Sequence, residues 1–71
     1  MNPRVEIKKI LLEKNMTLSE LAQKLGIILN KEYSLNNLSS KLRKETIPFK
    51  EIDLIAEILG YEIIFKEKSS F

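Results

Sequence analysis

Apolar residues recur at intervals of three and four through the middle of this 71-residue chain, and this spacing constrains the fold more than any other feature. From Leu18 to Leu25, apolar side chains stand at i, i+3, i+4 and i+7, the pattern of a helix with one buried face. Thr17 and Glu20 have the spacing of a capping box, so the helix is predicted to begin at Thr17. Gly26 predicts its end, because glycine accepts the positive φ that often follows a helix.

A second helix of different character is predicted from Ser34 to Glu45. Leucines at 35, 38 and 42 stand at i, i+3 and i+7, while most other positions carry amides, hydroxyls or cations. A helix with an apolar face and a polar face of this kind can read base edges in the DNA major groove. Residues 17–44 therefore predict a pair of helices suited to DNA binding.

Two more helices and a strand complete the expected fold. The first helix begins near Pro3, and the fourth runs from about Phe49 to Leu59. Residues 61–67 are rich in β-branched and aromatic side chains and are predicted to form a strand. The expected fold is a single, mainly α domain over residues 1–71, with about four helices and a C-terminal β-strand.

Composition excludes several classes of protein. A chain without cysteine has no disulfide or thiolate metal site, and one without histidine lacks imidazole catalysis and most zinc sites. We therefore expect no enzyme, no metal, no cofactor and no small-molecule ligand. No apolar run approaches the roughly 20 residues of a membrane span, and the N-terminus lacks a signal-peptide core, so a cytoplasmic protein is expected.

The distribution of charge is more informative than the net charge of +2. Residues 34–50 hold four cations and one anion, whereas residues 51–71 hold two cations and five anions. Although this imbalance is also compatible with ordinary solvated charges, it would attract a polyanion to one pole of the fold.

Three blocks of sequence, in order, resemble the Cro and phage-repressor group of lambda-repressor-like helix-turn-helix domains. They are Thr17-Leu-Ser-Glu-Leu-Ala-Gln-Lys-Leu-Gly26, Asn37-Leu-Ser-Ser-Lys-Leu42 and Ile47-Pro-Phe-Lys-Glu-Ile-Asp-Leu-Ile-Ala-Glu-Ile-Leu-Gly60, within a match over about residues 5–60. The resemblance implies a compact helical domain, commonly dimeric, that occupies an operator and blocks or assists RNA polymerase.

The chain departs from the family pattern in two respects. Gly26 and Ser34 are separated by a longer connection than the motif usually has. Leu18 and Leu35 stand where many family members place glutamines, so the contacts of those glutamines are not carried over. Within the connection, Tyr33 either stacks on a sugar or packs against neighbouring apolar residues, and packing is the preferred interpretation.

Side chains on and beside the second of the paired helices are the candidate DNA contacts. Amides, a hydroxyl and an ammonium group suit base edges, and the predicted base contacts are Asn36, Asn37, Ser40 and Lys41. Other polar and cationic side chains suit the DNA backbone, and the predicted phosphate contacts are Thr17, Gln23, Ser39, Arg43 and Lys44.

A lone terminal strand would leave its backbone groups unpaired, and a second copy of the chain could supply the partner. The predicted dimer joins antiparallel terminal strands, with contacts from Leu54, Ile58, Ile63, Ile64 and Phe65. Its two reading helices would enter successive major grooves about 34 Å apart, so an inverted-repeat site is expected. The alternative is that these apolar residues complete a monomeric core.

The leading hypothesis from sequence is a sequence-specific DNA-binding transcriptional regulator, expected to be a repressor that binds double-stranded DNA as a homodimer. The other hypothesis is a protein-interaction module of helix-turn-helix ancestry, such as an antitoxin, an anti-repressor or an assembly factor. The long connection and the two replaced glutamines favour this alternative. Binding to random duplex at low salt distinguishes the two.

Overall fold

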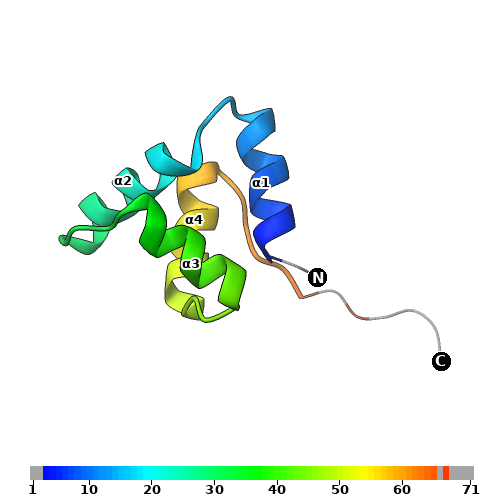
Figure 1. The fold of residues 1–71 in the computed structure, drawn as a ribbon. Coiled ribbons are helices and arrows are strands. Elements are labelled where there is room, and N and C mark those ends of the chain that lie inside the picture. Colours follow the sequence, from blue (N-terminus) through cyan, green and yellow to red (C-terminus); the bar gives the residue numbers. More distant parts are fainter. Residues whose placement is uncertain (1–2, 66, 68–71) are drawn as a thin grey trace.

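Four helices make up the fold in the computed structural model, which describes residues 3–65 and 67. They are α1 (Pro3–Glu13), α2 (Leu18–Leu29), α3 (Leu35–Lys44) and α4 (Phe49–Leu59). Figure 1 shows α4 behind α3, with α1 and α2 on either side. The mainly helical prediction is confirmed. Within the described residues, no helix is long and apolar enough to cross a membrane.

The core lies where α2, α3 and α4 meet. Leu21 and Leu25 of α2, Leu38 of α3 and Ile55 of α4 are fully enclosed, and Leu11 attaches α1 to them. Burying each such side chain contributes about 1.5–3 kcal/mol, so these few residues hold three helices together.

The start of α2 is the predicted one. The Glu20 amide donates to Thr17 Oγ1 at 3.1 Å, and the Thr17 amide donates to Glu20 Oε1 at 3.3 Å. Each residue thus satisfies a backbone donor that the first helical turn would leave unpaired.

The predicted end of α2 at Gly26 is wrong, because the helix continues for another turn to Leu29. Asn30 is the residue with left-handed backbone, at φ 54°, and its amide donates to the carbonyls of Gly26 and Ile27. Asparagine tolerates this conformation better than most residues. The connection between α2 and α3 consequently comprises residues 30–34. It begins three residues later than the sequence predicted, because α2 ends at Leu29 and not at Gly26.

The bounds of α4 agree with prediction. Pro48 precedes its first turn, and Gly60 follows it with φ 81°. Glycine adopts this conformation without steric cost, so the chain leaves the helix there.

The predicted C-terminal strand is not supported within the described residues. Residues 61–65 instead run back along α1 (Figure 1), and the Tyr61 hydroxyl donates to Glu13 Oε2 at 3.2 Å. A strand needs a neighbour for its backbone groups, and β-propensity alone does not provide one. Lys66, which belongs to the predicted strand, lies outside the described residues.

The apolar side chains of α4 divide between the core and the open surface. Leu54 and Ile58, predicted at a contact between two copies, are half-buried and pack against the core of their own chain. Phe49, in the first turn of α4, is 63% exposed. The open apolar surface therefore lies on the side of α4 that faces α1 and the C-terminal segment.

Candidate nucleic-acid interface

The helix α3 presents a polar face while Leu38 and Leu42 fix it to the core. Leu38 and Leu42 are 0% and 3% exposed, whereas Asn36 and Lys44 are exposed to solvent. Asn36, Ser40 and Lys44 stand at i, i+4 and i+8, so they lie along one side of the helix. Asn37 and Arg43 are also exposed, and Ser40 is half-buried.

The first turn of α3 is capped by Ser34. Its backbone is extended, with φ −84° and ψ 160°, and its Oγ accepts a hydrogen bond from the Asn37 amide at 3.0 Å. Because Ser34 performs the capping, the exposed side chains of Asn36 and Asn37 are not needed for it.

The predicted phosphate contacts occupy different parts of the surface. Gln23 lines an open depression of about 740 Å³ together with Ser34, which places it beside the start of α3. Thr17 lies at the other end of α2, with its hydroxyl engaged in the capping box. Ser39 is half-buried on α3.

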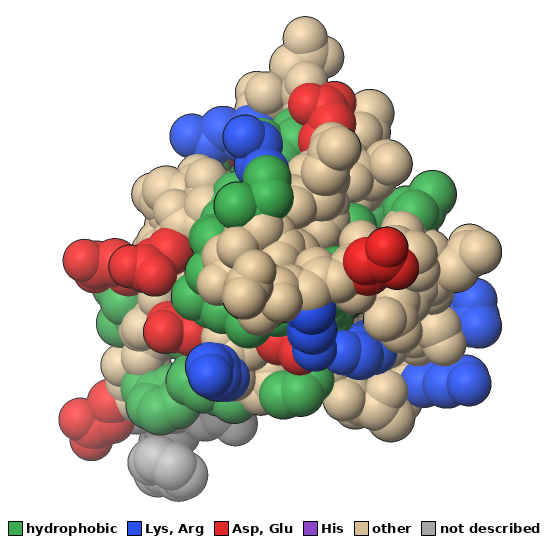
Figure 2. Space-filling model, turned by 90° about the vertical axis from the view of Figure 1, so that its left-hand side faces the viewer, with side chains coloured by type: hydrophobic (Ala, Val, Ile, Leu, Met, Phe, Trp, Pro, Cys, Tyr) green, Lys and Arg blue, Asp and Glu red, His purple; other side chains and the backbone are tan. Residues whose placement is uncertain are grey.

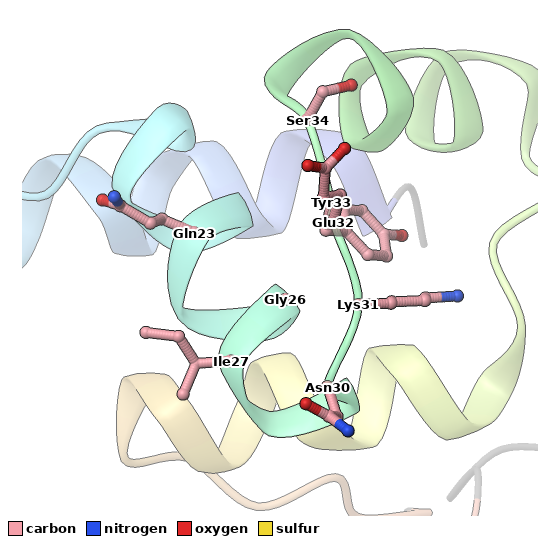
Figure 3. Close-up of a pocket in the computed structure, with 8 residues that line it drawn as sticks. All are labelled: Gln23, Gly26, Ile27, Asn30, Lys31, Glu32, Tyr33 and Ser34. Carbon is pink, nitrogen blue, oxygen red and sulfur yellow. The ribbon is translucent and has the colours of Figure 1, made fainter.

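The connection between α2 and α3 closes tightly over Gly26. A Cβ atom at Gly26 would lie 2.8 Å from the Lys31 carbonyl oxygen and 3.2 Å from Tyr33 Cβ. Figure 3 shows Gly26 facing the connection, with Lys31 and Tyr33 extending to the side opposite Gln23. Tyr33 is only 6% exposed and so packs inside the protein, as the preferred interpretation required, but the neighbouring Ile27 and Ile28 remain 76% and 52% exposed.

A polar cluster joins the connection, α3 and α4 at their meeting point. Glu51 is 7% exposed, and its Oε1 accepts hydrogen bonds from the Tyr33 hydroxyl at 2.5 Å and from Lys41 Nζ at 3.1 Å. Lys31 Nζ lies 4.0 Å from Glu51 Oε2, and Lys41 Nζ lies 4.7 Å from the centre of the Tyr33 ring. We refer to Lys31, Tyr33, Lys41 and Glu51 as the Glu51 cluster.

Ionisation of the Glu51 cluster follows from its geometry. Burial favours the neutral carboxyl, but hydrogen bonds from Tyr33 and Lys41 and the charges of Lys41 and Lys31 lower the pKa of Glu51 overall. Burial favours the neutral form of Lys41, yet its hydrogen bond to Glu51 and the contact with Tyr33 raise its pKa. Burial, followed by the hydrogen bond to Glu51, raises the pKa of Tyr33. At pH 7 Glu51 is therefore a carboxylate, Lys41 an ammonium group and Tyr33 a neutral phenol.

Lys41 consequently differs from the other predicted DNA contacts on α3. Its ammonium group is directed to Glu51, while Arg43 and Lys44 lie exposed in the last turn of the helix. Sequence reasoning missed Glu51 because it was counted as part of an acidic surface. A signal was present, since Glu51 stands at i−4 and i−8 from the buried Ile55 and Leu59 and thus on the inward stripe of α4.

Both signs of charge occur near the connection. Figure 2 shows the left-hand side of Figure 1, where several Lys and Arg side chains gather at the lower right, another lies at the upper left, and acidic side chains lie at the left, towards the top and right of centre. This face is thus not uniformly positive, and the cations of α3 carry the local excess that the sequence predicted for residues 34–50.

Two adjacent helices, α2 and α3, joined by a short connection and followed by a supporting α4, define a protein of the helix-turn-helix class. Residues 6–63 match the model of the Cro/C1-type HTH DNA-binding domain, and the chain belongs to this family. The resemblance to Cro and the phage repressors is thereby confirmed, and the protein contains a DNA-binding domain with a role in transcription regulation. Neither curated proteins nor solved structures gave a match to the chain.

Proposed function

We propose that the protein is a sequence-specific transcriptional regulator that places α3 in the major groove of its DNA site. The observation that supports this most directly is the exposed polar face of α3 above the buried Leu38 and Leu42. Such a helix is anchored on one side and open on the other, as groove reading requires. A regulator of this kind must be in the same compartment as its DNA, and we expect this compartment to be the cytoplasm.

In this proposal the first two turns of α3 read sequence. Asn36 and Asn37 can donate to and accept from adenine N6 and N7, and the short Ser40 side chain suits a base edge. The remaining contacts position the domain on the DNA backbone. The proposed phosphate contacts are Thr17, Gln23, Ser39, Arg43 and Lys44.

Substitution on α3 tests the proposal with fluorescence anisotropy on a selected duplex and a random duplex. Asn36→Ala or Asn37→Ala should weaken binding by about 1–3 kcal/mol and relax preference at one base position. Arg43→Ala or Lys44→Ala should weaken binding to both duplexes, and each should reduce the slope of log affinity against log salt by about 0.9. Lys9→Ala on the exposed face of α1 is the matched control and should leave the slope unchanged. If none of the four substitutions affects the selected duplex, α3 is not the reading helix.

We further propose that the protein acts as a dimer on an inverted-repeat operator and represses transcription by occupying it. An apolar groove of about 460 Å³ between α1, α4 and residues 61–65 supports dimerisation. Ile64 and Phe65 at its edge are 74% and 92% exposed, and apolar side chains grouped in this way favour burial in a contact. On an inverted repeat the two α3 helices of such a dimer would have to lie about 34 Å apart, the spacing of successive major grooves.

The same groove favours a second candidate function, that of a protein-interaction module. In that case the groove would receive another protein and α3 would have no role in DNA binding. Anisotropy with random duplex at low salt separates the two candidates, because a DNA-binding regulator shows weak, salt-sensitive association even without its operator.

A further inference from the structure

The Glu51 cluster lies directly beneath the proposed reading helix and is built from three segments. Tyr33 and Lys31 come from the connection, Lys41 from α3 and Glu51 from the first turn of α4. Lys41 Nζ donates to both carboxylate oxygens of Glu51, at 3.1 and 3.4 Å. Among the described residues, no buried side-chain nitrogen or oxygen lacks a hydrogen-bond partner, so the cluster is complete without a ligand.

The surroundings of Lys41 keep its ammonium group within the protein. The side chain of Lys41 is 26% exposed and that of Glu51 is 9% exposed. The ammonium group also lies over the Tyr33 ring, 4.7 Å from its centre, which is a favourable position for a cation. Moving Lys41 to a guanine would remove the closest cation from a buried carboxylate and leave it only the more distant Lys31 and the Tyr33 hydroxyl, and losing one partner of a buried ion pair is unfavourable.

We propose that Lys41 is a positioning residue and not a base contact: through Glu51 and Tyr33 it fixes the orientation of α3 relative to α4 and to the connection. The inference rests on the proposed function, since it concerns how the reading helix is held. It assigns the same role to Tyr33 and Glu51, neither of which is among the proposed base or phosphate contacts.

The Glu51 cluster restrains α3 in a way that the apolar core does not. Leu38 and Leu42 hold α3 to the core, but apolar contacts are non-directional. The hydrogen bonds of Lys41 are directional, and Tyr33 directly precedes the capping Ser34. The cluster therefore restrains both the middle of α3 and its first turn, from which Asn36 and Asn37 extend.

The first experiment follows the lysine ammonium groups of the wild-type protein by NMR, without and with a selected duplex. Lys41 should show a slowly exchanging ammonium signal in the free protein, and this signal should keep its chemical shift when DNA is added. Lys44 serves as the internal control, and its signal should move. A Lys41 signal that moves with that of Lys44 would overturn the inference.

The second experiment measures DNA affinity against salt for Lys41→Met, which keeps the aliphatic stem and removes the charge. Affinity for the selected duplex should fall about tenfold, with the salt slope and the preference at each base position unchanged. Lys44→Met is the comparison and should lower the slope by about 0.9. A lowered slope for Lys41→Met, or loss of preference at one base position, would show that Lys41 touches DNA.

Exchanging the two charges gives a further test. The double variant Lys41→Glu, Glu51→Lys should recover most of the affinity that either single substitution loses, provided that circular dichroism shows it folded. A folded double variant without recovery contradicts the inference. If the double variant does not fold, Tyr33→Phe replaces it. Tyr33→Phe should weaken binding to every duplex and leave the slope of log affinity against log salt unchanged. Absence of salt-sensitive binding by the wild type would instead overturn the proposed function, and the inference with it.

Discussion

Gly26 occupies a helical position at which any larger residue meets the backbone of the connection. Alanine is favoured over glycine inside a helix by about 1 kcal/mol. A Cβ at 2.8 Å from the Lys31 carbonyl oxygen, however, forces the backbone of residues 30–34 to move. Displacements of this kind typically cost about 1–3 kcal/mol, so the steric effect outweighs the helical preference.

We therefore expect Gly26→Ala to lower the free energy of unfolding by about 1 kcal/mol in urea denaturation, the steric cost less the helical gain. Ser19→Ala is the control, since Ser19 is exposed on the same helix. It should change stability by less than about 0.5 kcal/mol. A Gly26→Ala protein as stable as the wild type would show that the close approach at Gly26 is not a constraint.

Glu51 makes stability depend on pH in the acid range. Its pKa in the folded protein is below the usual value of 4.5, so the unfolded chain takes up a proton before the folded one does. The stabilisation is thus present above pH 4.5 and is lost as the pH falls through the lower pKa of the folded state.

Urea denaturation between about pH 6 and about pH 3 should show this loss in the wild type and a smaller loss in Glu51→Gln. Glu57→Gln, exposed on the same helix, should retain the wild-type dependence. Equal acid dependence in the wild type and Glu51→Gln would mean that the carboxylate is not stabilised in the fold.

At the scale of elements, substitutions at Ser34, which caps the start of α3, should affect both stability and DNA binding. Ser34→Ala removes the acceptor for the Asn37 amide and should lower the free energy of unfolding by about 1 kcal/mol. Ser34→Asp should keep stability, because its carboxylate caps the same amide and favours the positive end of the helix. The aspartate should nevertheless weaken DNA binding, since it places a negative charge near the phosphates. If Ser34→Asp binds the selected duplex as tightly as the wild type, the start of α3 does not approach DNA.

Element bounds were predictable where the signal is local. The capping pair Thr17 and Glu20 acts within one helical turn, and so do Pro48 before α4 and Gly60 after it. The end of α2 was not predictable in this way. Gly26 is needed because the connection passes too close to it for a side chain. The sequence alone does not distinguish a glycine needed for space from one needed for a positive φ.

The parts of the site that depend on tertiary contacts were harder to predict from sequence. The polar face of α3 follows from its leucine spacing, and Asn36 and Asn37 are exposed as that spacing requires. The partner of Lys41 is ten residues distant on another helix, so nothing local to α3 indicates it. The predicted terminal strand is not supported within the described residues, because β-propensity alone does not supply the neighbour that a strand needs.

At the scale of the whole molecule, the groove between α1, α4 and residues 61–65 leaves apolar surface open to solvent. Ile7 and Ile52 line it from the two helices and Ile64 from the C-terminal segment. Small domains of this length bury limited apolar area, so a contact that covers the groove adds stability as well as symmetry. Leu54 and Ile58 are partly buried against the core of their own chain and do not line the groove, so a contact at the groove uses Ile63, Ile64 and Phe65.

A charged side chain introduced into the groove should therefore prevent dimerisation. We expect sedimentation at micromolar concentration to show a dimer for the wild type and a monomer for Ile64→Lys, because a lysine there would have to be desolvated in the contact. Leu12→Lys is the matched control, since Leu12 is 82% exposed on α1 and does not line the groove. Ile64→Lys should bind an inverted repeat no more tightly than a single half-site, whereas Leu12→Lys should keep the wild-type advantage for the repeat. A wild-type protein that stays monomeric while saturating an inverted repeat, or an Ile64→Lys protein that remains dimeric, would remove the groove from the proposed mechanism.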